Sequence, residues 1–206
     1  MRNTVTGLVV VVHGGRSQSR EPTSPVQPAV VRMIPLAAAV RRAAGPAVKV
    51  IRPRLRLRGW NGAEASPVAD LTAILDGLPD LPLVLIGHSM GARAALRVAA
   101  DPRVTGVAGL APWTPPGEPV DQLTGRRVLL VHGTADTVTS PADTLAYAAR
   151  ARRLTEVATI SLTGADHAML RRAALWHRLA ADFALSCLTT PPPSIARAFD
   201  HEHTTL

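Results

Sequence analysis

The chain has 206 residues, of which 47% are hydrophobic and 18% are charged. This length suits a single domain, and this composition is typical of a globular protein and too apolar for a disordered one. The net charge of +8 comes almost entirely from arginine, because Lys49 is the only lysine. The arginines are scattered along the whole chain, without the basic, aromatic-interleaved surface that binds single strands, so we expect no nucleic-acid partner.

The single cysteine, Cys187, lies in an apolar run and cannot form an internal disulfide. We expect a buried thiol and a reducing, cytoplasmic compartment. The apolar stretch 8–12 near the N-terminus is short and ends in His-Gly-Gly, which indicates a first strand rather than a signal peptide. No apolar run approaches the length of a membrane span.

Short β-branched runs alternate with alanine-rich stretches along the chain, and this alternation is typical of βαβ units. Strands are predicted over 6–12, 48–52, 83–86, 104–110, 127–131 and 155–161. Helices are predicted over 27–44, 68–78, 91–100, 141–153 and 169–188. We expect one domain over 1–188, followed by a flexible tail over 189–206 that opens Thr-Thr-Pro-Pro-Pro.

These elements predict an α/β fold with a single doubly wound, mostly parallel six-stranded sheet. The most economical order places the second strand outside the first and the third strand on the other side of the first. The carboxyl ends of the first and third strands are then neighbours, and ligands bind at such a switch point. These two ends carry His-Gly-Gly at 13–15 and Gly-His-Ser-Met-Gly at 87–91.

Ser89 is the candidate nucleophile. It lies between a predicted strand and a small-residue helix, which is the context that a sharp strand-to-helix turn requires. The flanking glycines allow the backbone and the neighbouring helix to approach closely. The motif alone arises by chance about one time in twenty at this composition. The alternative is a plain tight turn with a capping serine.

A serine needs a general base, and His167 is the best placed of seven histidines because it follows the last predicted strand at the same carboxyl edge. Asp136, just past the fifth strand, is the candidate acid that orients this base, which gives the chain order Ser, Asp, His. Asp166 is the rival carboxylate. A solvated loop histidine and a capping aspartate remain the alternatives for these two positions.

The oxyanion of an acyl-transfer intermediate needs two N–H donors. The residue after the nucleophile, Met90, is expected to supply one. Gly15 is the favoured second donor, with Gly14 close behind, because the register of this loop is not fixed by the sequence. A simple glycine turn is the alternative.

These motifs, together with His-Gly-Thr-Ala-Asp at 132–136 and Gly-Ala-Asp-His at 164–167, resemble those of the α/β-hydrolase superfamily over almost the whole chain. The chain is most similar to small, capless esterase-like and dienelactone-hydrolase-like members. Dienelactone hydrolases commonly use cysteine where this chain has Ser89, which favours ester cleavage. The resemblance implies a minimal fold without a cap domain and no cofactor or metal. A short proline-rich link over 113–127 stands where a cap is often inserted, so we expect an open site.

The run 51–58 alternates arginine with apolar residues and Pro53. One interpretation is an edge strand protected by charge; the other is that Arg58 and Trp60, just past it, bind an anionic or aromatic part of the substrate. Trp113 and His88 are further candidates for substrate contact.

The predicted activity is hydrolysis of small or accessible carboxylic esters through an acyl-enzyme. An acyltransferase on the same scaffold and a ligand-binding protein with little turnover are the alternatives. The oligomeric state is left open by the sequence.

Overall fold

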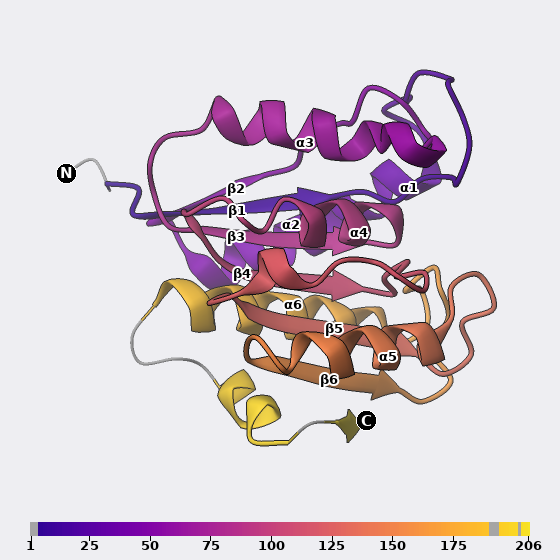
Figure 1. Ribbon diagram of the computed structural model, residues 1–206. Coiled ribbons are helices and arrows are strands. Elements are labelled where there is room, and N and C mark those ends of the chain that lie inside the picture. The colour runs from indigo at the N-terminus through magenta and orange to yellow at the C-terminus, as the bar shows by residue number, and fades with distance from the viewer. Residues whose placement is uncertain (1–3, 190–193, 202) are drawn as a thin grey trace.

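The computed structural model describes residues 4–189, 194–201 and 203–206, and it shows one parallel sheet between two layers of helices (Figure 1). The sheet has seven strands in the order β2-β1-β3-β4-β5-β6-β7. The strands are Gly7–Val12 (β1), Val48–Ile51 (β2), Leu83–His88 (β3), Val104–Leu110 (β4), Arg127–Gly133 (β5), Val157–Leu162 (β6) and Thr204–Thr205 (β7). The predicted order of the first three strands is confirmed.

The helices cover both faces of the sheet, so the central strands are apolar on both sides. In β1, Leu8 and Val10 face one hydrophobic cluster and Val9 and Val11 face the other, because successive side chains of a strand point to opposite faces. These helices span Met33–Ala44 (α2), Ser66–Asp76 (α3), Met90–Arg97 (α4), Pro141–Ala151 (α5) and Ala173–Leu188 (α6). The first cluster includes side chains of α3, α4 and α5, and the second includes those of α2 and α6.

The helix predicted over 27–44 is divided in two. A short helix, Pro28–Val31 (α1), is separated from α2 by the single residue Arg32. Pro35 explains the break, because its ring lacks an N–H and clashes with the carbonyl group four residues earlier, at Val31.

The prediction of six strands is wrong by one, because the segment 189–206 supplies β7. Thr204 and Thr205 pair with Ile160 and Ser161 of β6, and the Leu206 N–H donates to the Ser161 carbonyl at 2.9 Å. The part of this segment that the structure describes is therefore attached to the sheet rather than free. A strand of two residues has no periodicity that sequence analysis could detect.

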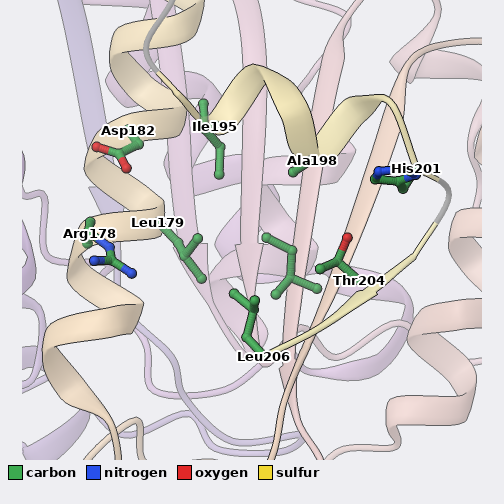
Figure 2. A pocket seen from close by; sticks show the side chains of 9 residues that line it. Arg178, Leu179, Asp182, Ile195, Ala198, His201, Thr204 and Leu206 are labelled. Carbon is green, nitrogen blue, oxygen red and sulfur yellow. The ribbon is translucent and has the colours of Figure 1, made fainter.

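A cavity of about 500 Å³ lies between α6 and this C-terminal segment (Figure 2). Arg178 and Asp182 line it from α6, and His201 faces them from the C-terminal side. Its other lining residues are Ile160, Leu179, Ile195, Ala198, Thr204 and Leu206. Ser89 does not line this cavity, so it is separate from the predicted site.

The arginine-rich run leaves the sheet instead of extending it. The edge strand β2 ends at Ile51, and the residues after it make only isolated bridges, between Pro22 and Leu57 and between Arg16 and Gly59. The alternation in sequence is matched by an alternation in solvent exposure, since Leu55 is buried and the arginines on either side of it are exposed. The predicted edge strand is therefore wrong beyond Ile51, and this run crosses the carboxyl edge of the sheet as a loop.

The carboxyl ends of β1 and β3 lie next to each other, with Val12 paired to Gly87. The loops after β1, β2, β3, β5 and β6 all start at this edge because the strands are parallel. Among the described residues, we find no helix that combines the length and the hydrophobicity needed to cross a membrane.

Candidate active site

Ser89 occupies a strained turn between β3 and α4. Its backbone has φ 55° and ψ −119°, a conformation that residues with a side chain rarely adopt. A Cβ atom at Gly87 would lie 2.4 Å from the Ala92 Cα, and one at Gly91 would lie 2.3 Å from the His13 carbonyl oxygen. Glycine is thus needed on both sides of the serine so that α4 can pack directly against β3 and the end of β1.

The strain at this turn predicts a difference in the free energy of unfolding between two variants that both lack the hydroxyl group. We expect Ser89→Gly to be more stable than Ser89→Ala by about 1 kcal/mol, because relief of the positive-φ strain exceeds the backbone entropy that glycine loses on folding. Urea unfolding of both variants measures the difference. A Ser89→Ala protein as stable as Ser89→Gly would show that the surrounding fold imposes no strain at this residue.

The structure brings Ser89, His167 and Asp136 together in one hydrogen-bonded chain. The Ser89 Oγ lies 3.0 Å from Nε2 of His167, and Nδ1 of His167 lies 2.8 Å from Oδ2 of Asp136. His167 follows β6 and Asp136 follows β5, so the parallel sheet places both loops beside the serine turn. Asp166 accepts a bond from the Leu170 N–H instead, and it makes no bond to His167.

Asp136 is buried and held by several donors. Its Oδ1 accepts hydrogen bonds from the backbone N–H groups of Val138 at 2.8 Å and Thr139 at 3.0 Å. Its Oδ2 accepts from the Thr139 hydroxyl group, from His132 and from His167. Burial opposes ionisation, but the bonds from Thr139, His167 and Val138 outweigh it and lower the pKa of Asp136. The carboxyl group is therefore ionised and fixed in orientation.

His132 and Thr139 are functional candidates that the sequence analysis missed. His132 bridges Asp136 and Thr144, with Nε2 3.0 Å from Oδ2 of Asp136 and Nδ1 2.8 Å from the Thr144 Oγ1. Burial lowers the pKa of His132, so its neutral form donates one proton to Asp136. The Thr139 Oγ1 lies 3.2 Å from Nδ1 of His167. In the sequence, His132 was only the first residue of the His-Gly-Thr-Ala-Asp motif and was given no role of its own. A threonine three residues after an acid carries no distinctive signal, so only the fold reveals these contacts.

His88, which was predicted to contact substrate, lies buried outside the cavity beside Ser89. It is 1% exposed, it does not line the cavity beside Ser89, and its ring lies 4.9 Å from that of His167. Its Nε2 is 2.8 Å from the His167 carbonyl oxygen. Burial, with a smaller contribution from His167, lowers the pKa of His88 to about 3. The neutral ring therefore donates to that carbonyl and supports the loop that carries His167.

The low pKa of His88 predicts a loss of stability in acid. The unfolded chain takes up a proton below about pH 6.5, whereas the folded protein does so only near pH 3, so the free energy of unfolding falls as the pH decreases between these values. One pKa unit corresponds to about 1.4 kcal/mol, so His88 accounts for about 3 kcal/mol of this loss by pH 4.5.

The variant His88→Gln keeps a donor for the His167 carbonyl but cannot be protonated, so the loss from pH 7 to pH 4.5 should be smaller in this variant by that amount. Urea unfolding at both pH values measures it. His201→Gln, at an exposed histidine, is the control and should behave as the wild type does. An unchanged pH dependence in His88→Gln would contradict the expected burial of a neutral ring.

The predicted oxyanion donors lie beside Ser89. Gly15 and Met90 line the same cavity as Ser89, and a Cβ atom at Gly15 would lie 2.4 Å from Cε of Met90. Neither of their N–H groups donates a hydrogen bond to any residue that the structure describes. Gly14 is buried against His88 and does not line this cavity. The geometry therefore favours Gly15 over Gly14 as the second donor.

The cavity at Ser89 has a volume of about 540 Å³. It is lined by Gly15, Arg16, Ser17, Gln18, Ser89, Met90, Trp113, Val138 and Thr139. Trp113, a predicted substrate contact, thus lines the same cavity as Ser89. Arg58 lines a smaller neighbouring cavity of about 200 Å³, and its guanidinium group is paired with Glu21. The link between Trp113 and Arg127 contains one short 3-10 turn and no cap.

Trp60, which was predicted to contact substrate, does not line either of these cavities. It is 3% exposed and packs edge to face against Trp113 at 5.9 Å. The guanidinium group of Arg93 lies 3.8 Å from the ring of Trp60 and 4.4 Å from that of Trp113. Arg93 and Arg97 both pair with the buried Glu118. This cluster fixes the wall of the cavity behind Trp113.

None of the described residues form a group of three or more side chains suited to hold a metal ion. The donor set at Ser89 consists instead of a hydroxyl group, an imidazole and a carboxylate in series, an arrangement suited to proton transfer and nucleophilic attack.

Comparison with known proteins gives a family match. A model of the alpha/beta hydrolase family matches residues 9–200, which is nearly the whole chain. No sequence among the curated proteins matches it.

Solved structures share the fold at low sequence identity. Est1E from Butyrivibrio proteoclasticus is 13% identical with a TM-score of 0.63, over 89% of this chain and 88% of that one. XC6422 from Xanthomonas campestris, described as a serine hydrolase without a lid, is 18% identical with a TM-score of 0.60, over 87% and 82% of the two chains. A monoacylglycerol lipase from Paleococcus ferrophilus is 14% identical with a TM-score of 0.64, over 87% and 95%.

Proposed function

Because the chain belongs to the alpha/beta hydrolase family, and is therefore a hydrolase, we propose that it cleaves carboxylic esters through an acyl-enzyme formed on Ser89. One observation carries this proposal: the Ser89 hydroxyl group, the His167 imidazole and the Asp136 carboxylate form a continuous hydrogen-bonded chain. Such a chain turns a weak hydroxyl nucleophile into a strong one.

In the proposed reaction, Nε2 of His167 takes the proton as the Ser89 Oγ attacks the ester carbonyl. Asp136 holds Nδ1 of His167 protonated and stabilises the imidazolium that forms. The tetrahedral intermediate expels the alcohol, which receives the proton from His167. Water then attacks the acyl-enzyme, with His167 acting first as base and then as acid, and the carboxylic acid leaves.

The oxyanion of each tetrahedral intermediate accepts hydrogen bonds from the N–H groups of Met90 and Gly15 in this proposal. Met90 also lies at the N-terminus of α4, where the helix dipole favours negative charge. The absence of a cap over the described link between β4 and β5 supports a small or surface-presented ester as substrate.

Labelling with a fluorophosphonate tests the proposal, since this reagent phosphonylates an activated serine. We expect the intact protein to gain one label, and mass spectrometry of the digest should find it on Ser89. The variant Ser89→Ala should gain none. A folded wild-type protein that stays unlabelled, or a label on another serine, would overturn the proposal. Release of acid from a panel of 4-nitrophenyl esters of rising chain length then defines the acyl preference.

A further inference from the structure

Among the described residues that line the cavity at Ser89, Arg16 is the only charged one. It follows Gly15 directly, and it also lines the smaller neighbouring cavity together with Arg58. Arg16 therefore lies at the junction of the two cavities.

The Arg16 side chain has no partner in the part of the chain that the structure describes, unlike those of the neighbouring Arg20 and Arg58. Arg20 pairs with Glu64 at 2.7 Å, and Arg58 pairs with Glu21. Among the described residues, the Arg16 guanidinium group has no carboxylate within 4.0 Å and no hydrogen-bond acceptor. An unpaired guanidinium group in a cavity is available for an anion.

The backbone of Arg16 is fixed on both sides. Its N–H donates to the Arg58 carbonyl at 2.8 Å, and its own carbonyl accepts from the Trp60 N–H at 2.9 Å. Trp60 is in turn packed against Trp113 and Arg93. The Cα atom of Arg16 is therefore held next to Gly15, so little backbone entropy is lost when the side chain binds a ligand.

We propose that the ester cleaved at Ser89 carries a carboxylate group, and that Arg16 binds it. This inference rests on the proposed function. A carboxylate matches the planar guanidinium fork, which can donate two parallel hydrogen bonds to it. No described acidic residue lines the cavity to repel such a group. The nearby Asp136 is buried, and its carboxylate is engaged by its own donors. The excess of arginine over acidic residues also favours the approach of an anion. Arg16 thus replaces Arg58 as the residue that selects for negative charge.

The test compares pairs of esters that differ in charge and little in shape. One pair carries the charge on the alcohol side: 4-carboxyphenyl acetate and 4-carbamoylphenyl acetate. The other carries it on the acyl side: the mono-4-nitrophenyl ester of adipic acid and 4-nitrophenyl hexanoate. The measured quantity is the ratio of kcat/KM for the anionic ester to that for the neutral ester in each pair.

We expect the wild-type protein to prefer the anionic member of at least one pair, and Arg16→Gln to lower that ratio about five- to tenfold. Arg16→Lys, which keeps the charge but loses the fork, should lower it less. The preference should also weaken between 0.05 and 0.5 M salt, because the group is exposed. Arg54→Gln removes one positive charge from an exposed position outside the cavity, and its ratio should match that of the wild type.

Two outcomes separate this inference from the proposed function. Equal ratios in the wild type and Arg16→Gln, with both esters cleaved, would overturn the role of Arg16 and leave the esterase in place. Failure of the wild type to cleave any ester would overturn the proposed function, and calorimetric binding of 4-acetamidobenzoate to Ser89→Ala would then test the carboxylate site by itself. Binding that is unaffected by the added Arg16→Gln change would overturn the site as well.

Discussion

Replacement of Ser89 by alanine is expected to lower kcat for a short-chain 4-nitrophenyl ester by about a millionfold. The expectation follows from the proposed acyl-enzyme, because without Oγ no covalent intermediate can form and His167 has no hydroxyl group to deprotonate. In serine hydrolases that act through such a unit, the loss of the nucleophile removes almost all of the rate enhancement, and only substrate binding and oxyanion stabilisation remain. Steady-state kinetics at high enzyme concentration measures the residual rate.

The same substitution should leave the fold unchanged, because alanine keeps the Cβ atom and therefore the same backbone strain at φ 55°. Circular dichroism and thermal unfolding check this. Ser186→Ala, which removes a hydroxyl group bonded to the Phe183 carbonyl at the far end of α6, is the matched control and should keep its activity. If Ser89→Ala retained more than about 1% of the wild-type kcat, the nucleophile would have to lie elsewhere.

Replacement of Asp136 by asparagine is expected to lower kcat about ten-thousandfold. The carboxylate Oδ2 accepts from Nδ1 of His167, and this bond keeps the proton on Nδ1 so that Nε2 is free to accept from Ser89. An amide that turns its NH₂ group toward His167 favours the other tautomer, which cannot act as base. His132 and Thr139 would also lose the acceptor that they share at Oδ2. The same esters and a thermal unfolding curve give both readouts.

Asp166→Asn is the matched control, because it makes the same chemical change on the residue next to His167. Asp166 accepts a bond from the Leu170 N–H and makes none to the imidazole, so we expect kcat to stay within a few-fold of the wild type. A large loss in Asp166→Asn together with a small loss in Asp136→Asn would reverse the assignment of the acid.

The part of the site that could be predicted from sequence is the part that depends on strand ends. A parallel sheet sends every βα loop to one edge, so a serine after β3, an aspartate after β5 and a histidine after β6 must face the same crevice once the strand order is known. Continuous apolar runs made the strand positions predictable. For β4, the predicted bounds 104–110 coincide with the observed strand Val104–Leu110.

The surroundings of the site could not be predicted in this way, because burial depends on partners that are distant in the chain. Trp60 is covered by Arg93 from α4 and by Trp113 from the loop after β4. The guanidinium group of Arg58 is already paired with Glu21, a residue 37 positions away in the chain. No local pattern distinguishes these residues from Arg16 and Trp113, which do line the cavity.

The positions of the three tryptophans have an optical consequence. Trp60 and Trp176 are 3% and 0% exposed, whereas Trp113 is partly exposed and lines the cavity at Ser89. A molecule that enters this cavity displaces water from a single indole ring and leaves the other two in unchanged surroundings. The protein therefore contains its own fluorophore for occupancy, and the emission of Trp113 follows ligand entry without any attached dye.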